Sequence, residues 1–270
     1  MDVPVRPAAT VMLVRDGAGV TQLEVLMVRR SLESDFVGGA YVFPGGGLDP
    51  SDGSGAERFC AGGDDRAAST LLGLEHGGLA YWVAALRECF EEAGILLAYR
   101  ADGSLLSLGD PDEALRFVEY RRALNAGELS LFELCERESL TLACDLVRYF
   151  AHWITPPGAP RRYDTRFFVA PAPPEQDPLH DAAEIIASMW IRPADALARY
   201  EAKEIEMVLP TLRNLRAIGQ FPNCAALLDD VSRQGIVTTV APRYVGDEYG
   251  SRIVLPSDSG DETVDMAERG

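Results

Sequence analysis

One short run of this 270-residue chain carries the side chains best suited to chemistry, RECFEEAGI at residues 87–95. On a helix that turns about 100° per residue, Glu88, Glu91 and Glu92 share roughly 100° of arc, opposite an apolar side. At about 6 Å and an effective dielectric near 20, each carboxylate pair repels by roughly 3 kcal/mol. Arg87 offsets one charge, and a hard divalent cation would remove the conflict. The pattern indicates a cation site, and a solvated acidic helix face is the alternative.

A glycine corner precedes this run. Residues 39–46 read GAYVFPGG, which predicts a short strand that ends in Phe43 and Pro44 and then turns at Gly45 and Gly46. Without a Cβ, such a backbone can approach a ligand closely through its bare main-chain groups. An ordinary turn is the alternative. The glycines match neither GxGxxG nor GxxxxGK[ST], so Rossmann and P-loop nucleotide sites lack their residues.

Cysteine and histidine usage narrows the choice of metal. The five cysteines are scattered and form no CxxC pair, which argues against a disulfide framework or a zinc site. The three histidines, His76, His152 and His180, have no partners at a recognisable spacing, and we expect them to be non-catalytic. A site built from carboxylates would favour Mg²⁺, Mn²⁺ or Ca²⁺.

The overall charge restricts the partners. Forty-two acidic residues against 25 basic ones give a net charge of −17, which repels nucleic acids and anionic membrane surfaces. No apolar run approaches the roughly 18 residues of a membrane span, and the first residues lack a secretory signal pattern. We therefore expect a cytoplasmic protein that binds a small molecule, with no nucleic acid and no membrane partner.

Hydrophobic patterning predicts strands and helices without a βαβ rhythm, which indicates an α+β fold with a mixed sheet. Residues 49–79 are rich in glycine and predict an insertion or mobile loop. The expected strands are 8–15 and 23–30 (a hairpin), 40–43, 95–99, 149–155, 166–170 and 185–191. The expected helices are 79–93, which stops at Gly94, 112–144, one that opens at 193–197, and 209–218.

The glycine corner and the acidic run together resemble the Nudix hydrolase signature GX5EX7REUXEEXGU, where U is a bulky aliphatic residue. Gly46 matches the first glycine, and residues 87–95 match every fixed letter of the second half, with Cys89 at a U position. Asp52 stands where the signature has Glu, and residues 53–86 separate it from Arg87, where the signature has seven. An interrupted box of this kind is similar to a branch that includes eukaryotic coenzyme A diphosphatases.

A second motif points to the same branch. Nudix enzymes that cleave coenzyme A carry LLTXR(S/A)X3RX3GX3FPGG before the box. Residues 26–31 and 39–46 reproduce its spacing, while Asp35 replaces the internal Arg. The resemblance implies that Arg29, Arg30, Phe43 and Gly45 contact substrate.

The resemblance also implies roles in the box. Glu91 and Glu92 would be metal ligands, Glu88 a ligand or the base, and Arg87 an orienting residue. The Gly46 carbonyl could complete the coordination of Mg²⁺ or Mn²⁺, and Asp52 could reach the site only if the insertion folds away from it. Some family members carry a further loop carboxylate that binds metal or acts as the base. Glu184 is the candidate for this residue here, and the alternatives in the same loop are Glu175, Asp177 and Asp181.

Residues 161–168, RRYDTRFF, form the densest positive segment. If this segment is a strand, Arg162, Asp164 and Arg166 share one face, and the two arginines are candidate anchors for substrate phosphates. Pairing between Arg and Asp on the surface is the alternative. The aromatic residues of the segment are expected in the core.

The resemblance implies a Nudix-like α/β/α sandwich over residues 1–200, with a glycine-rich insertion at about 53–79 and an added helical segment at about 111–145. We expect a helical or irregular extension at 201–256, which could form a lid or homodimer contacts, and a flexible acidic tail at 257–270.

The implied activity is metal-dependent hydrolysis of a diphosphate bridge in a nucleoside-diphosphate-linked substrate, with CoA or acyl-CoA as the leading candidate. An ADP-ribose or dinucleotide diphosphatase is one alternative. A nucleotide-binding module without hydrolysis, favoured by Asp35 and Asp52, is the other.

Overall fold

The core of the molecule is a mixed β-sheet in a computed structural model, which describes residues 3–17, 22–32, 38–178, 185–247, 250–255 and 262–265. Its strands follow the order β10-β7-β8-β1-β2-β3, with β4 paired to β1 and β9 paired to β2. β1 runs parallel to β8 and antiparallel to β2, so the expected hairpin and the mixed sheet are both confirmed. These strands are β1 (Val5–Asp16), β2 (Leu23–Arg30), β3 (Tyr41–Val42), β4 (Gly45–Gly47), β7 (Arg148–Ile154), β8 (Arg162–Pro171), β9 (Ile185–Ile191) and β10 (Thr239–Val240).

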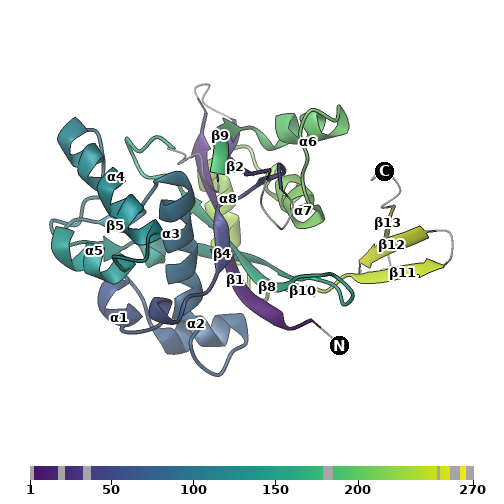
Figure 1. Cartoon of the computed structure of the whole chain (residues 1–270), viewed down its shortest axis with the longest axis horizontal. Coiled ribbons are helices and arrows are strands. Elements are labelled where there is room, and N and C mark those ends of the chain that lie inside the picture. Colours follow the sequence, from purple (N-terminus) through teal and green to yellow (C-terminus); the bar gives the residue numbers. More distant parts are fainter. Residues whose placement is uncertain are drawn as a thin grey trace.

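Both faces of the central strands are buried. Along β1, Val11 and Leu13 belong to one hydrophobic core, whereas Met12 and Val14 belong to the other. This follows from the period of two along a strand, because a run of apolar residues then supplies side chains to both sides. The expected α/β/α sandwich is confirmed, with one helical layer on each face of the sheet (Figure 1).

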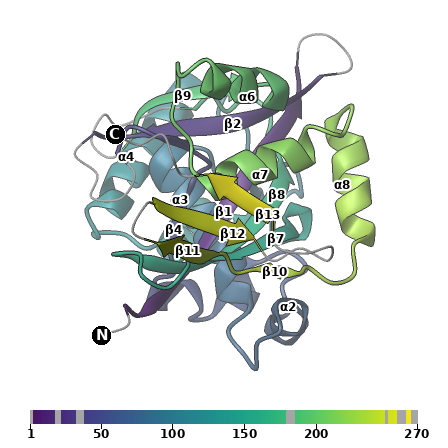
Figure 2. The same cartoon turned by 90° about the vertical axis from the view of Figure 1, so that its right-hand side faces the viewer.

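The first helical layer contains the acidic helix. Figure 1 shows it at the left of the sheet, and it consists of α1 (Ala56–Phe59), α2 (Asp65–Leu72), α3 (Leu79–Ala93), α4 (Pro111–Asn125) and α5 (Leu131–Glu138). Figure 2, viewed from the opposite layer, shows α7 in front of the sheet and α3 behind it. That second layer consists of α6 (Pro193–Glu201), α7 (Leu209–Ile218) and α8 (Cys224–Arg233), whose apolar residues share one core with the sheet.

Of the two alternatives expected for the glycine-rich segment, an insertion or a mobile loop, the structure shows a folded insertion. The 3₁₀ turn η1 (Pro50–Asp52) precedes the insertion, which contains α1 and α2. Asp65 at the start of α2 accepts hydrogen bonds from the backbone N–H groups of Gly77 and Leu79, at 2.9 Å each. Because Gly78 has no side chain to cap α3, Asp65 supplies the acceptor that the first turn of that helix needs.

The single helix expected over 112–144 is wrong. α4 ends before Gly127, whose φ of +69° leaves the helical region, and Ser130 then caps α5 in a capping box with Glu133. Ser139, at φ +52°, ends α5, and the short strand β6 (Thr141–Leu142) follows. The signals for this break, a glycine and an S-x-x-E pattern, are present in the sequence.

The strand expected at 95–99 is shorter than predicted. Only Ala98–Tyr99 (β5) forms a strand, paired with β6. Before it, the Gln176 side chain accepts from the N–H of Leu96 and donates to the Leu96 carbonyl, at 2.9 and 3.0 Å. A buried amide therefore takes the place of a neighbouring strand.

Of the expected flexible tail at 257–270, the structure describes only residues 262–265, which form a strand, and the strands before them belong to the expected extension. β11 (Arg243–Asp247), β12 (Gly250–Leu255) and β13 (Glu262–Asp265) form a three-stranded antiparallel sheet beyond the end of β10 (Figure 1). All five cysteines are free thiols, as expected from their scatter. Within the described ranges, every helix is too short or too polar to cross a lipid bilayer.

The end of α3 depends on Gly94, which adopts φ +71° and donates its N–H to the Phe90 carbonyl. A side chain in this left-handed region costs about 1–2 kcal/mol. We therefore expect Gly94→Ala to lower the free energy of unfolding by that amount, measured by urea denaturation. Gly53→Ala is the matched control, because Gly53 has φ −91° and an added Cβ would make only an ordinary contact at 3.6 Å with Ala80. Equal effects of the two substitutions would contradict this account.

Candidate active site

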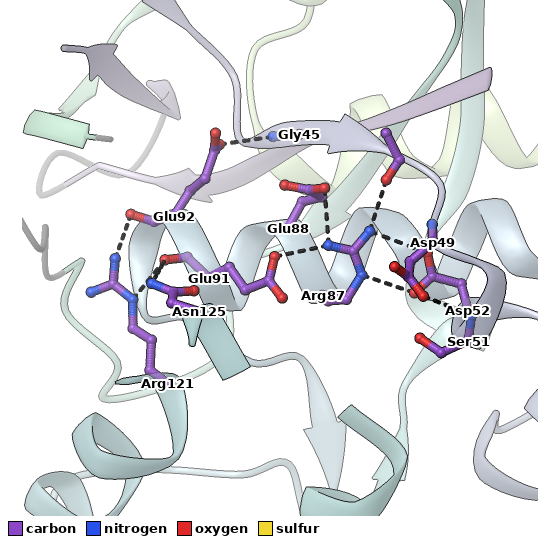
Figure 3. Close-up of polar contacts among 11 residues, drawn as sticks. Gly45, Asp49, Ser51, Asp52, Arg87, Glu88, Glu91, Glu92, Arg121 and Asn125 are labelled. Atoms are coloured by element: carbon purple, nitrogen blue, oxygen red, sulfur yellow. Dashed lines mark hydrogen bonds and ion pairs between the residues drawn. The ribbon is translucent and has the colours of Figure 1, made fainter. Parts of the chain in front are cut away.

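Arg87 is the centre of a network of charged groups on α3 (Figure 3). Its Nε and Nη2 donate to the two carboxylate oxygens of Asp52 at 2.9 and 3.1 Å, and Nη2 also donates to the Gly47 carbonyl at 2.8 Å. Its Nη1 donates to Glu88 at 2.9 Å and to Glu91 at 2.8 Å. One guanidinium thus fixes three carboxylates and the end of β4, as its planar fork of donors allows.

The network is largely removed from solvent. Burial would lower the pKa of Arg87, but the hydrogen bond to Asp52 and the charges of Glu88 and Glu91 outweigh it and raise that pKa. Glu92 is 5% exposed, and the Glu88 and Glu91 side chains are 15% and 21% exposed. A solvated acidic helix face, the alternative left open by the sequence, is therefore wrong.

The glycine corner lies directly against these carboxylates. The Gly45 N–H donates to Glu92 Oε2 at 2.9 Å. A Cβ placed on Gly46 would lie 2.5 Å from Glu88 Oε1, so the carboxylate occupies the space that any other residue would fill. Gly45 and Gly46 are held there because β4 pairs with β1. The structure thus brings together Arg87, the three glutamates and the glycine corner, residues far apart in the sequence.

Asp52 reaches the site because the insertion begins after it. Asp49 and Asp52 cap η1 reciprocally, and the Asp49 N–H donates to Asp52 Oδ2 at 2.7 Å. The chain then leaves through α1 and α2 and returns at Leu79, so the shorter carboxylate still bridges to Arg87.

The added helical segment also supports α3. Arg121 of α4, only 7% exposed, donates to the backbone carbonyls of Glu91 and Glu92, at 2.8 Å each. Asn125 makes a longer contact, 3.5 Å, with the same Glu91 carbonyl (Figure 3). A cation at a helix C-terminus interacts favourably with the negative end of the helix dipole, and it donates to carbonyls that have no intrahelical partner. Arg121 therefore fixes the backbone that carries the two glutamates.

We expect Arg121→Met to lower the free energy of unfolding by about 3 kcal/mol, because two buried carbonyls lose a charged donor. Thermal and urea denaturation measure this loss. Arg122→Met is the control, since Arg122 forms an ion pair with Glu119 in which both side chains are exposed, and it should change stability by less than about 0.5 kcal/mol. A loss at Arg121 no larger than that at Arg122 would show that the carbonyl contacts contribute little.

A cavity of about 510 Å³ opens beside the carboxylates. Glu88, Glu91 and Glu92 line it together with Gly45, Gly46 and Gly47. The rest of the lining comes from β1, β2, β3, β7 and β8, from residues 208–211 at the start of α7, and from residues 43, 155, 156, 161 and 242. This volume falls within the range of small-molecule sites.

Of the arginines expected to contact substrate, Arg30 lines the cavity but Arg29 does not. Arg29 donates to the Gly39 carbonyl at 3.1 Å and lies over the Tyr41 ring. The pairing of β2 with β9 shifts between Arg29 and Arg30, which interrupts the alternation of side chains at this point. Phe43 and Gly45 line the cavity as expected.

Arg162 and Arg166 do not line the cavity, and the structure does not support them as phosphate anchors. Arg166 is buried, ion-paired with Asp164 and in contact with His152, while Arg162 donates to the Thr155 carbonyl at 3.1 Å. Burial would raise the pKa of Asp164, but its hydrogen bond with His152 and the charge of Arg166 outweigh it and lower that pKa. Arg161, the neighbour passed over in the sequence, lines the cavity instead.

Of the four candidates for the loop carboxylate, the structure describes two, Glu175 and Asp177. Glu184 and its rival Asp181 lie outside the described residues, as does Asp35. Glu175 and Asp177 line a separate cavity of about 160 Å³ between α3 and α4, and Glu175 accepts a hydrogen bond from Ser107. Neither of them faces the carboxylates of α3 through the larger cavity.

The donor set suits a hard divalent cation. Carboxylate oxygens on successive turns of one helix, beside bare glycine backbone, are ligands of the kind that Mg²⁺ and Mn²⁺ prefer. In their present rotamers, no three His, Cys, Asp or Glu side chains of the described ranges are gathered closely enough to hold an ion. Binding would therefore require Glu88 and Glu91 to turn from Arg87 toward the cavity that they already line.

These features define the Nudix class, and the comparisons confirm it. A family model described as the NUDT19 Nudix domain matches residues 58–218. The crystal structure of a Nudix hydrolase from Alicyclobacillus acidocaldarius superimposes with a TM-score of 0.66 and 32% sequence identity, over 84% of this chain and 96% of that one. The chain belongs to the Nudix hydrolase family. Within that family it matches the NUDT19 type.

Curated relatives carry a more specific name. The acyl-coenzyme A diphosphatase NUDT19 of Gallus gallus is 30% identical over 239 residues, 75% of this chain and 63% of the relative. The Homo sapiens protein of that name is 28% identical over 238 residues, 75% of this chain and 62% of the relative. The chain therefore spans less than two thirds of the length of these relatives.

Three parts of the site were missed from the sequence. Arg121 and Asn125 lie in a segment judged only as helical, and the i,i+4 spacing that puts them on one face does not reveal their partner. Arg161 was missed because strand alternation does not say which face of β8 meets the cavity. Residues 208–211 fell in the extension, and no motif marks them.

Proposed function

We propose that this protein is a divalent-metal-dependent diphosphatase, with Mg²⁺ or Mn²⁺ as the cofactor. The observation that supports this most is the convergence of three carboxylates and a glycine corner on one cavity of substrate size. In this proposal Glu88, Glu91 and Glu92 bind the metal, and the Gly46 carbonyl adds a main-chain ligand. Family membership supports the reaction class, since Nudix hydrolases generally use divalent metals.

When bound, such an ion neutralises the diphosphate and lowers the pKa of a bound water. The chain itself contributes position and proton transfer. Arg87 gathers Asp52, Glu88 and Glu91 beside the glycine corner, so that Glu88 and Glu91 need only change rotamer to bind the metal. A carboxylate then takes the proton from the attacking water. Glu88 is our candidate for this base, and Glu184 stays a second candidate.

We propose a coenzyme A ester or free coenzyme A as the substrate. The names of the curated relatives support this choice, and so does the position of Arg30, which the motif assigns to CoA and which lines the cavity. Arg161 is a second cation of the lining, and guanidinium groups bind phosphates well. The non-hydrolysing alternative loses one of its supports, because Asp52 keeps the ion pair with Arg87.

Product analysis tests the substrate. Hydrolysis of CoA with Mg²⁺, and then Mn²⁺, should release 3′,5′-ADP and 4′-phosphopantetheine, with slower turnover of ADP-ribose, NADH and diadenosine polyphosphates. Faster turnover of any of the other substrates would replace CoA as the substrate. Tight binding of CoA without product in either metal would favour the non-hydrolysing module.

The role of Glu92 is tested by Glu92→Gln. The amide oxygen can still accept from the Gly45 N–H, so the fold should survive, but the loss of a charged ligand should lower kcat at least 100-fold. Binding of Mn²⁺, followed by its paramagnetic resonance signal, should weaken in parallel. Glu119→Gln, on the exposed face of α4, is the control and should leave both unchanged. Full Mg²⁺-dependent turnover by Glu92→Gln would exclude Glu92 as an essential ligand.

The glycine corner allows a matched pair. Gly46→Ala puts a methyl group 2.5 Å from the Glu88 carboxylate, whereas the nearest atom to a methyl group on Gly47 is 4.0 Å away. Both glycines lie on β4 and line the cavity. We expect Gly46→Ala to reduce kcat/KM at least tenfold and Gly47→Ala to reduce it less than threefold. If the two variants have the same activity, close approach at Gly46 is not required.

A further inference from the structure

The wall formed by residues 208–210 has a different chemistry from the carboxylate side of the cavity. Val208, Leu209 and Pro210 line it together with Ile154 at the end of β7. Every carboxylate that lines the cavity, among the residues that the structure describes, belongs to α3. The remaining wall is therefore a place where an apolar group can be removed from water without facing an acidic side chain.

This wall is fixed to the fold. Val208 precedes α7, and Leu209 and Pro210 are its first two residues. The helix is anchored by Leu215 and Ile218, both fully buried in the core that α7 shares with the sheet. Proline suits the first turn of a helix, where its missing N–H is not needed. The apolar side chains at 208–210 are thus presented by a rigid element, which is what a specificity site requires.

The side chains of this wall suit an alkyl chain better than a nucleotide base. Val208, Leu209, Pro210 and Ile154 are aliphatic and partly exposed, whereas the partly exposed aromatic side chain of the cavity lining, Tyr163, belongs to β8. A base gains most from stacking on an aromatic face and from hydrogen bonds to its edge. Aliphatic side chains offer neither, and Pro210 has no N–H to donate.

We propose that residues 208–210 and Ile154 form a subsite for the acyl group of a thioester substrate. The segment beyond α6 then selects acyl-CoA over free CoA. This inference rests on the proposed function, and it gives part of the C-terminal extension a role that neither the signature nor the CoA motif assigns. Because each buried methylene contributes up to about fourfold in affinity, kcat/KM should rise with acyl length until the wall is covered.

The test compares CoA with its acetyl, butanoyl, hexanoyl and octanoyl thioesters in the full chain. For the wild type we expect the ratio of kcat/KM for acyl-CoA to that for CoA to rise two- to fourfold per methylene over part of the series. Leu209→Asp places a charge on the wall and should lower that ratio at least tenfold for hexanoyl-CoA. Leu209→Ala, which only shortens the side chain, should lower the ratio of kcat/KM for hexanoyl-CoA to that for CoA about threefold. This second variant keeps the test valid if Leu209→Asp is unstable.

The control is Leu115→Asp on α4, where the side chain is 62% exposed and is not part of the cavity lining, and it should leave every ratio unchanged. A wild-type ratio that is independent of acyl length overturns the subsite while leaving the diphosphatase intact. An equal loss for CoA and acyl-CoA in both Leu209 variants also overturns it, because the wall would then contact a part common to both substrates. Wild-type protein that hydrolyses neither CoA nor its thioesters overturns the proposed function, and the subsite with it.

Discussion

The site depends on one buried guanidinium. Arg87 lies among the carboxylates of Asp52, Glu88 and Glu91 and also binds the Gly47 carbonyl, which ties α3 to the strand that carries the glycines. Without this cation, the carboxylates would repel each other in a poorly solvated place and turn outward. With it they stay gathered beside the glycine corner, where we propose that a divalent ion binds them.

The two segments that interrupt the family pattern act on the same helix. The insertion supplies Asp65, which caps the first turn of α3, and the added helices supply Arg121, which binds the carbonyls of its last turn. The glutamates are therefore carried by a helix whose two ends are held by side chains from outside it. The extension contributes on the other face of the sheet, where α7 and α8 complete the second core and the start of α7 presents the apolar wall. The insertion, the added helices and the extension thus all contribute structure to the site.

The sequence predicted what local patterns determine. The bounds of α3, its stop at Gly94 and the hairpin of β1 and β2 follow from periodicity and turn residues, and the fixed letters of the box placed the glutamates. What failed depended on tertiary contacts. Composition could not show that a glycine-rich insertion packs as helices. Alternation along β8 could not show which face of the strand meets the cavity. The sequence therefore favoured Arg162 and Arg166 as phosphate anchors, whereas Arg161 lines the cavity. The start of α7 lines the cavity because of how the helix packs on the sheet, and no sequence motif marks it.

The central claim is that the carboxylates gathered by Arg87 bind a divalent cation at the glycine corner. The most direct measurement is anomalous diffraction from crystals grown with Mn²⁺. The account predicts one or more manganese peaks within coordination distance of Glu88, Glu91 and Glu92 and next to Gly46. Peaks located only elsewhere on this acidic surface, or carboxylates that keep their contacts with Arg87 in saturating Mn²⁺, would contradict it.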